Sequence, residues 1–371
     1  MAPGKPAQRN DAAGNSAQTP AHRAVRDAIR AILPSYDPSD DEKGWSEIGL
    51  DSFDLLSLRL ALEERTGTEL SDEDWTAADT PAALGRRAAA SAARREAPAQ
   101  SDVRLSETVE LGMPQMALSG LSESWLLKAL GDWHWRMIGD ALETRPVDIS
   151  DSFGNRLYPA FTRLRFRSSA PLAAYREGER LRAEASLTRY GAAIFFSSAR
   201  IDGEDGRTIE AELMSSFICR GGDGGNAQLL RAQPVLPQPC AAPAHSEMTA
   251  FGEDYARRRR TRESARPVLA RAGYSLLPQY DINGVGLLYY AAYPMIADIC
   301  AMRSRPEGAA WVTGTSTIER DISYFANADA SAGLEWRLHG DLGGDGLDTE
   351  ASIVRDDGVA MALVTTRKIP V

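Results

Sequence analysis

Apolar residues recur at helical spacing in the first quarter of the chain. Residues 21–33 and 52–66 place valine, isoleucine and leucine three or four positions apart, the pattern of helices that bury one face. Two shorter helices are expected to begin at Ser71 and at Pro81, the second preceded by a capping threonine. We expect these segments to form a four-helix bundle over residues 21–95.

Beyond residue 103 one long helical run is followed by strand-like runs, and the pattern then recurs. The first helical run covers residues 122–142, and its strands are expected at residues 157–166, 180–187, 192–196 and 213–219. The second helical run covers residues 285–302, and its strands are expected at residues 311–319, 323–325, 333–338, 351–354 and 361–367.

One helix followed by antiparallel strands is the element order of the hot-dog fold, in which a sheet wraps a central helix. The recurrence predicts two such domains, at residues 105–221 and 246–371. The fold class is therefore α+β, with a helical bundle followed by a double hot-dog.

Segments with few core residues separate these regions. Residues 1–20 are rich in alanine, proline, glutamine and asparagine, so we expect a disordered tail; they lack the apolar core of a signal peptide. Residues 96–104 form a small expected linker. Residues 222–245, rich in glycine and then proline, form another.

Composition is that of a soluble globular protein, with 43% hydrophobic and 25% charged residues in 371 positions. No run of eighteen apolar residues occurs, which argues against a membrane span. Three widely spaced cysteines and four scattered histidines form neither a disulfide framework nor a metal-binding pattern. We therefore expect a cytoplasmic protein without a metal.

Negative charge is concentrated near the N-terminus. Residues 36–80 carry fourteen acidic and three basic side chains, a net charge of −11, whereas the whole chain carries −10. Such a segment attracts basic partners over long range and disfavours binding to nucleic acid.

The acidic segment contains Asp51-Ser52, directly before its longest helical run. A serine at this position most often caps the helix. However, an apolar helix, a loop with Trp45, Ile48 and Leu50, and then Asp-Ser before an acidic helix resembles an acyl carrier protein over residues 20–95. The resemblance implies that Ser52 carries 4′-phosphopantetheine, which a phosphopantetheinyl transferase installs.

Three motifs stand out beyond residue 105: Gly131-Asp132-Trp133-His134-Trp135, Leu157-Tyr158-Pro159-Ala160-Phe161 and the stretch from Asp281 to Tyr290. With these motifs, residues 105–371 resemble the leinamycin-type bifunctional acyltransferase/decarboxylases of polyketide biosynthesis. The resemblance implies a double hot-dog that takes methylmalonyl, or a malonyl-type group, from coenzyme A. The enzyme would decarboxylate this group, deliver propionyl to a carrier protein and supply a downstream polyketide synthase. It also implies that Tyr158 holds the acyl group. In this chain the carrier protein is fused N-terminal to the enzyme region.

Decarboxylation of a β-carboxy thioester requires stabilisation of an enolate oxygen, which backbone N–H groups at a helix N-terminus provide. Two helix starts with suitable glycines are expected, at Ser119-Gly120 and at Asn283-Gly284. The alternative for each is a turn that requires glycine. Tyr158 could be a nucleophile or a proton donor, and its alternative is a core tyrosine.

Other hot-dog functions stay open. Asp281-x-Asn283 resembles the start of a thioesterase signature, Asp-x-Asn-x-x-His, but Val285-Gly286 stands where the histidine is expected. A dehydratase would require a base, and His134 is either that base or a partly exposed helical histidine. A non-catalytic docking module is the third alternative.

Two further features have an ordinary interpretation beside a functional one. The arginines at residues 257–260 could meet coenzyme A phosphates or an acidic carrier, but a solvated helix face is more usual. Cys300 lacks an evident histidine partner, which favours a buried structural thiol over a nucleophile.

Overall fold

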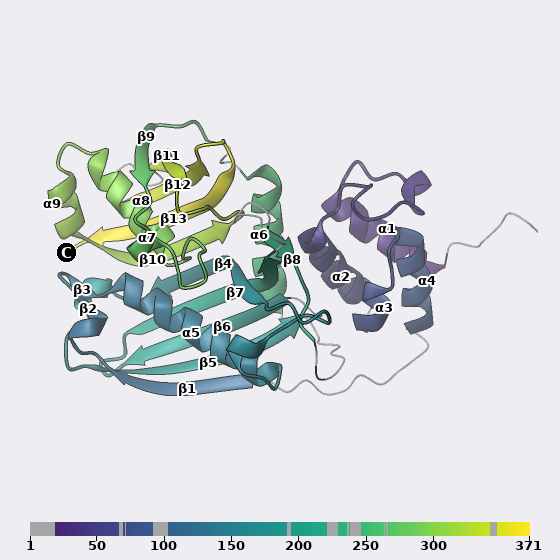
Figure 1. The fold of residues 1–371 in the computed structure, drawn as a ribbon, viewed down its shortest axis with the longest axis horizontal. Helices are drawn as coiled ribbons and strands as arrows, with labels where there is room; N and C mark the ends of the chain where they lie inside the picture. Colours follow the sequence, from purple (N-terminus) through teal and green to yellow (C-terminus); the bar gives the residue numbers. More distant parts are fainter. Residues whose placement is uncertain are drawn as a thin grey trace, which may run out of the picture. The chain divides into compact units, whose positions relative to one another are not determined.

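The computed structural model describes residues 19–66, 70, 72–91, 103–190, 194–220, 229–235, 237, 246–262, 264, 266–341 and 347–371. The chain divides into two compact units, Met1–Ala97 and Pro98–Val371 (Figure 1). Each unit has its own cluster of buried apolar side chains. The expected tail falls almost entirely outside the described residues, as do most of the two expected linkers.

The first unit is helical throughout its described part. Its helices are α1 (Pro20–Ile32), α2 (Ser52–Thr66), α3 (Asp72–Thr76) and α4 (Pro81–Ser91), with a short 3-10 turn at Pro38–Asp40. Thr80 caps α4 as expected, because its hydroxyl accepts from the Ala83 N–H at 3.2 Å. The cap expected at Ser71 lies outside the described residues.

The core of this unit forms where the apolar faces of the helices meet. Val25 and Ile29 of α1 are buried with Leu58 and Leu62 of α2 and Leu84 of α4. The helical spacing of these apolar residues therefore reflects the burial of one face of each helix, as the sequence predicted.

The connection between α1 and α2 is fixed by polar contacts. The Trp45 indole N–H donates to the Ala78 carbonyl at 2.7 Å. Asp41 accepts hydrogen bonds from both Arg26 and Tyr36, and burial together with this carboxylate raises the pKa of Tyr36. These contacts hold the loop that leads to Ser52.

The second unit is built on one antiparallel sheet, with eleven strands among the residues that the structure describes. Its first half contains β1 (Val103–Glu110), β4 (Tyr158–Ser168), β5 (Arg180–Tyr190), β6 (Ile194–Gly203) and β7 (Thr208–Arg220). Its second half contains β9 (Ala270–Ser275), β10 (Thr315–Tyr324), β11 (Gly333–Asp341), β12 (Asp348–Arg355) and β13 (Ala360–Pro370).

Both halves have the same topology. The spatial order is β1-β5-β6-β7-β4 in the first and β9-β11-β12-β13-β10 in the second, so the first and second strands of each half lie at opposite edges. A long helix joins those two strands in each half: α5 (Glu123–Ala141) and α8 (Ala292–Arg303). Figure 1 shows α5 lying across β5, β6 and β7. This is the hot-dog arrangement, present twice.

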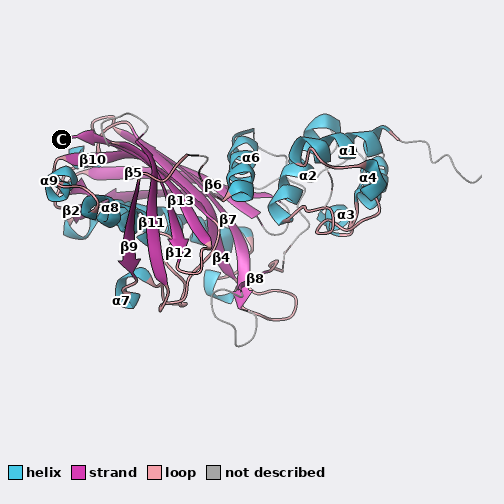
Figure 2. Cartoon of the chain, turned by 90° about the horizontal axis from the view of Figure 1, so that it is seen from above, coloured by secondary structure: helices cyan, strands magenta, loops and turns pink. Residues whose placement is uncertain are grey.

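The halves join through β4 and β10, which pair so that Leu164 lies opposite Ile322. Both side chains are fully buried. Figure 2 shows the strands of the two halves running side by side as one sheet. The buried apolar cluster is correspondingly continuous, with Leu127 and Leu130 of α5 and Ile296 of α8.

Shorter elements fill the connections. They are β2 (Met116–Ala117), β3 (Gly120–Leu121), β8 (Leu229–Arg231), α6 (Ser246–Thr261), α7 (Pro278–Asp281), α9 (Gly308–Thr313) and 3-10 turns at Met113–Gln115, Pro146–Asp148 and Leu172–Ala174. None of the described helices combines the length and apolarity that a membrane crossing requires.

Several expected elements are wrong in detail. The second long helix begins at Ala292, not at residue 285, because residues 283–288 form a hydrogen-bonded turn. The strand expected at residues 311–319 begins later, because residues 308–313 form α9. Its remainder and the strand expected at residues 323–325 form one strand, β10. Part of the linker expected at 222–245 forms β8, which pairs with β7.

The first strand of each half was missed. Every second residue of β1 is exposed and polar (Arg104, Ser106, Thr108, Glu110), and β9 consists largely of alanine, arginine and glycine. Edge strands that bury small or few side chains carry a weak hydrophobic signal.

Candidate functional site

Ser52 is the first residue of α2 in the first unit. The cap of this helix is supplied one residue earlier: the Asp51 carboxylate accepts from the Asp54 N–H at 3.2 Å, and the Asp54 carboxylate accepts from the Asp51 N–H at 3.1 Å. Asp51 thus fills the capping position that the ordinary interpretation assigned to Ser52. Buried Leu50 and Leu58 hold this turn on the core.

Tyr158 begins β4 in the second unit and is half-buried. It lies opposite Ile218 in the β4–β7 pair. The Arg156 guanidinium carbon lies 5.0 Å from the centre of the Tyr158 ring, a cation–π contact.

The turn at Asn283 lies at the same end of the sheet. Its side-chain oxygen accepts from the N–H groups of Val285 (3.1 Å) and Leu287 (2.9 Å). Arg220, two residues beyond Ile218 on β7, donates to the Val285 carbonyl. Arg220 thus links the Asn283 turn to the strand, β7, that pairs with the start of β4.

The expectation that Asn283-Gly284 starts a helix is wrong. The amides of Val285, Gly286 and Leu287 donate within the turn, and α8 starts only at Ala292. A Cβ built on Gly284 would meet nothing within 4 Å, so crowding does not require glycine there. The first turn of α8 offers few donors at this end, because the Ala292 N–H donates to the Tyr289 carbonyl at 2.8 Å and Pro294 has no N–H.

Gly120 lies elsewhere and does not start a helix either. It is in β3 with φ +110°, and a Cβ would come within 2.4 Å of the Leu172 carbonyl oxygen. Leu172 follows the far end of β4, and eleven residues of extended strand span roughly 33 Å. The structure thus separates Gly120 from Tyr158.

The N-terminus of α5 is already satisfied. Ser122 caps it by accepting from the Trp125 N–H at 3.3 Å, and the Glu123 carboxylate pairs with buried Arg320 at 2.7 Å. Arg320 also reaches Asp298 of α8, which Lys368 contacts at 3.0 Å. The two cations lower the pKa of Asp298 against the effect of its burial, and the two carboxylates raise the pKa of Arg320.

The two central helices occupy equivalent places in the two halves, yet their first turns differ. Ser122 and Glu123 complement the positive end of α5, whereas α8 has neither a side-chain cap nor an acidic residue in its first turn. The positive end of α8 is thus not complemented by a side chain of its own, although its Ala292 N–H donates to the Tyr289 carbonyl.

A cluster of aromatic side chains, which sequence reasoning missed, lines the α8 end. The Tyr290 hydroxyl donates to the Leu127 carbonyl of α5 at 2.9 Å, and its ring lies 4.4 Å from Phe161 and 4.7 Å from Tyr289, between centroids. Burial raises the pKa of Tyr290 well above its usual value. In the sequence, the adjacent tyrosines Tyr289 and Tyr290 were the signal that could have indicated this aromatic cluster.

His134 is fully buried, and the expectation of a partly exposed histidine is wrong. Its Nδ1 lies 2.7 Å from the Ser197 hydroxyl and its Nε2 lies 2.8 Å from the Ser215 hydroxyl. Burial lowers its pKa to about 3, so the ring is neutral and both nitrogens are occupied. This arrangement does not suit a base that must reach a substrate.

Asp281, the first residue of the thioesterase-like signature, is also buried. Its carboxylate accepts from the Leu277 N–H at 2.7 Å and from the Tyr274 hydroxyl at 3.1 Å. Burial beside this carboxylate raises the pKa of Tyr274 to about 12. The carboxylate of Asp281, the last residue of α7, therefore binds the backbone of Leu277, the residue before the helix.

Cys300 and part of the arginine run at residues 257–260 have structural roles. Burial raises the pKa of the Cys300 thiol to about 11, as expected for an inert core cysteine. Arg258 pairs with Asp254 at 3.0 Å and with Asp321 at 3.1 Å, and Arg257 pairs with Asp254. Arg258 thus links α6 to β10, whereas the Arg257–Asp254 pair lies within α6 on an exposed face.

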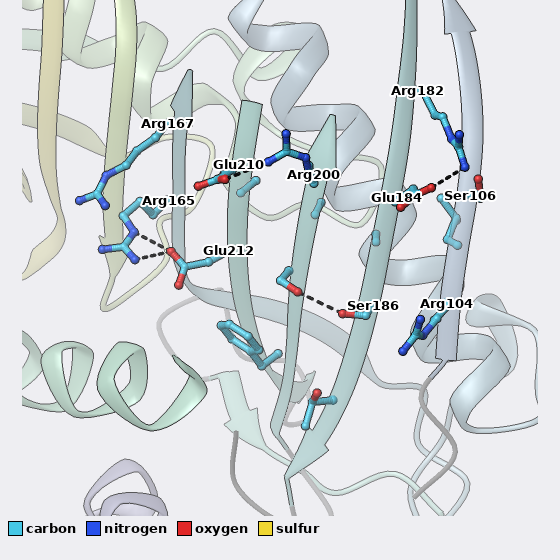
Figure 3. A pocket seen from close by; sticks show the side chains of 17 residues that line it. Arg104, Ser106, Arg165, Arg167, Arg182, Glu184, Ser186, Arg200, Glu210 and Glu212 are labelled. Atoms are coloured by element: carbon cyan, nitrogen blue, oxygen red, sulfur yellow. Dashed lines mark hydrogen bonds and ion pairs between the residues drawn. The ribbon is translucent and has the colours of Figure 1, made fainter. Parts of the chain in front are cut away.

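A groove of about 1040 Å³ lies on the outer face of the first half of the sheet (Figure 3). Serines occupy its floor, where Ser186 and Ser198 hydrogen-bond at 3.0 Å, and arginines surround it. Cross-strand carboxylates pair with several of them, as in Arg200–Glu210 at 3.3 Å. None of the site residues predicted from the sequence lines this groove.

Within the described residues no group of three or more histidine, cysteine, aspartate or glutamate side chains is placed to hold a metal ion.

Comparison with known proteins adds one assignment. Residues 23–88 match the family described as a phosphopantetheine attachment site. No curated protein matches the chain. Similar solved structures include an acyl-ACP thioesterase from Bacteroides thetaiotaomicron (12% identity, 72% of this chain and 98% of that one, TM-score 0.49) and the 12:0-ACP thioesterase from Umbellularia californica (10%, 72% and 98%, 0.49). The first unit is thus a phosphopantetheine-binding carrier domain, and the strand order of the second makes it a hot-dog fold.

Proposed function

We propose that this protein transfers an acyl group from coenzyme A to the phosphopantetheine thiol on its own Ser52, and that it decarboxylates a methylmalonyl or malonyl-type group before delivery. The observation that carries the proposal is the fusion of a phosphopantetheine attachment domain to a hot-dog unit. A carrier needs a phosphopantetheinyl transferase to install its arm. In this proposal, a polyketide synthase accepts the product.

The α8 end suits the decarboxylation step. When the bond between the α-carbon and the carboxylate breaks, carbon dioxide leaves and the electron pair forms an enolate whose oxygen carries the charge. The Tyr293 N–H would stabilise that oxygen, since of its neighbours in the first turn of α8 Ala292 already donates to the Tyr289 carbonyl and Pro294 has no N–H. A proton from solvent then adds to the α-carbon, which gives the propionyl thioester when the starting group is methylmalonyl.

In this proposal Tyr158 holds the acyl group between its two thioester carriers. Its oxygen attacks the thioester carbonyl, the C–S bond breaks, and coenzyme A leaves as a thiol with the phenolic proton. The pantetheine thiol then attacks the aryl ester, and the proton returns to the Tyr158 oxygen. Each exchange breaks one acyl bond and forms another, so no water is consumed.

The geometry favours transfer over the two other hot-dog reactions. The two signature residues of a thioesterase are engaged in holding the backbone, since Asp281 accepts from the Leu277 N–H and Asn283 accepts from N–H groups of its own turn. Val285 offers no group that could activate water. A dehydratase base is also unsupported, because both His134 nitrogens contact serine hydroxyls inside the core.

Intact-protein mass spectrometry tests this function. The pantetheinylated protein is incubated with methylmalonyl-CoA, and a propionyl adduct on Ser52 is expected. The Ser52→Ala variant should not be loaded but should still release carbon dioxide, because decarboxylation takes place in the second unit. Free acid without loading would favour a thioesterase, and an unchanged protein with unchanged substrate would favour a docking module.

A further inference from the structure

We propose that Arg156 recognises the free carboxylate of the substrate acyl group and thereby selects malonyl-type thioesters over simple acyl thioesters. This inference rests on the proposed function and identifies which side chain would define its substrate class. It uses a residue that the sequence patterns did not single out.

Arg156 is an exposed arginine whose charge is uncompensated in the described part of the chain. Its guanidinium stacks on Tyr158 but forms no ion pair with a described carboxylate. Many neighbouring arginines of the second unit do: Arg163 pairs with Asp321, and Arg165 with Glu212. A cation without a carboxylate partner among the described residues, beside a candidate acyl acceptor, is placed to bind an anion.

The backbone holds Arg156 in a defined position. Ser150 and Arg156 form an antiparallel bridge that closes the loop between them. Within this loop the Asp151 carboxylate accepts from the N–H groups of Phe153 (2.9 Å) and Asn155 (2.8 Å). The loop base is therefore fixed before a ligand arrives, which reduces the entropy lost on binding.

The chemistry of the substrate fits this placement. In a malonyl-type thioester the carboxylate is separated from the thioester carbonyl by one carbon atom, so both groups lie within a few ångströms. If Tyr158 receives the carbonyl carbon, the carboxylate comes close to the cation stacked on the same ring. Arg220, two residues beyond the strand partner of Tyr158, already donates to the Val285 carbonyl.

An arginine in this role has opposite effects on binding and on decarboxylation. It stabilises the carboxylate of the bound substrate, and this interaction is lost when carbon dioxide forms. Arg156 therefore lowers KM for a carboxylated thioester without increasing kcat, because it favours the ground state over the transition state. A merely structural contact would not separate the two constants in this way.

The test compares Arg156→Gln, Arg156→Lys and the control Arg176→Gln, an exposed arginine beyond the far end of β4, in the complete pantetheinylated protein. Loading of Ser52 from methylmalonyl-CoA and from propionyl-CoA is followed by intact mass, and carbon dioxide release is measured separately. For Arg156→Gln we expect KM for methylmalonyl-CoA to rise roughly 10- to 100-fold, the range for one charge-assisted hydrogen bond, with kcat for decarboxylation unchanged or higher. Lysine should restore part of the affinity, because it keeps the charge but not the planar fork.

Transfer from propionyl-CoA, which lacks the carboxylate, should have the same kinetics in Arg156→Gln as in wild type, and Arg176→Gln should resemble wild type with both substrates. An unchanged KM for methylmalonyl-CoA in Arg156→Gln would overturn the inference while leaving the proposed function intact. An equal loss with both substrates would overturn it as well, since it would indicate a structural role. If wild type loads Ser52 from neither thioester, the proposed function itself fails.

Discussion

Acidification should destabilise the second unit through one identified side chain, His134. This imidazole is fully buried between Ser197 and Ser215, and its pKa in the folded protein is about 3. In the unfolded chain a histidine has a pKa of ~6.5. At pH 7.5 the ring is neutral in both states and contributes no pH dependence. Below pH 6.5 the unfolded chain binds a proton that the folded chain cannot, so stability falls until pH reaches about 3.

The magnitude follows from the two pKa values. At pH 5.0 the solution lies about 1.5 units below the pKa of the unfolded chain, and each unit corresponds to ~1.36 kcal/mol, which gives a loss of about 2 kcal/mol relative to pH 7.5. His134→Gln isolates this contribution. Glutamine can donate to one serine hydroxyl and accept from the other, but it does not titrate in this range.

The assay is urea denaturation of both proteins at pH 7.5, 6.5, 5.5 and 5.0, followed by tryptophan fluorescence. Contributions of other groups, including all those of the carrier unit, are common to the two proteins and cancel in their difference. The free energy of unfolding of wild type should fall by about 2 kcal/mol more than that of His134→Gln between pH 7.5 and 5.0. Parallel pH profiles would refute the reasoning, because they would show that His134 takes up its proton equally well in the folded state.

Three further substitutions have defined outcomes. Tyr158→Phe should abolish loading of Ser52 measured by intact mass, and normal loading would exclude the aryl ester. Gly131→Ala places a Cβ 1.8 Å from the Tyr290 hydroxyl oxygen, so urea denaturation should show a loss of roughly 1–3 kcal/mol. The same change in a Tyr290→Ala background should cost less; an equal cost would contradict the clash. Arg320→Met leaves the Glu123 carboxylate without its buried partner, and we expect about 3–5 kcal/mol of destabilisation in thermal or urea unfolding. A loss below 1 kcal/mol would show that the carboxylates are adequately solvated.

The helices of the carrier domain could be read from the sequence because their signals are local. A proline after Thr80 and apolar residues at helical spacing define helix ends and faces without reference to distant parts of the chain. Asp51-Ser52 before α2 likewise depends on neighbours only, and Asp51 proves to be the cap.

The double hot-dog could be inferred from the recurrence of its element order, but its site could not be located by that order. The run from residue 285 looks helical because it is apolar, yet Asn283 and the carbonyl groups around it bind its amides and delay α8 to Ala292. Both predicted helix starts were misplaced, because a glycine near a helix does not show which amide groups remain free.

The amino-acid sequence by itself determined the carrier motif, the helical faces and the double repeat, since these depend on spacing along the chain. Only the tertiary structure decided which groups meet. Pairing of β4 with β7 places Tyr158 opposite Ile218, two residues from the arginine that contacts the Asn283 turn, and closure of the sheet around α5 buries His134 between two serines. Such contacts join residues far apart in the chain, and no local spacing specifies them.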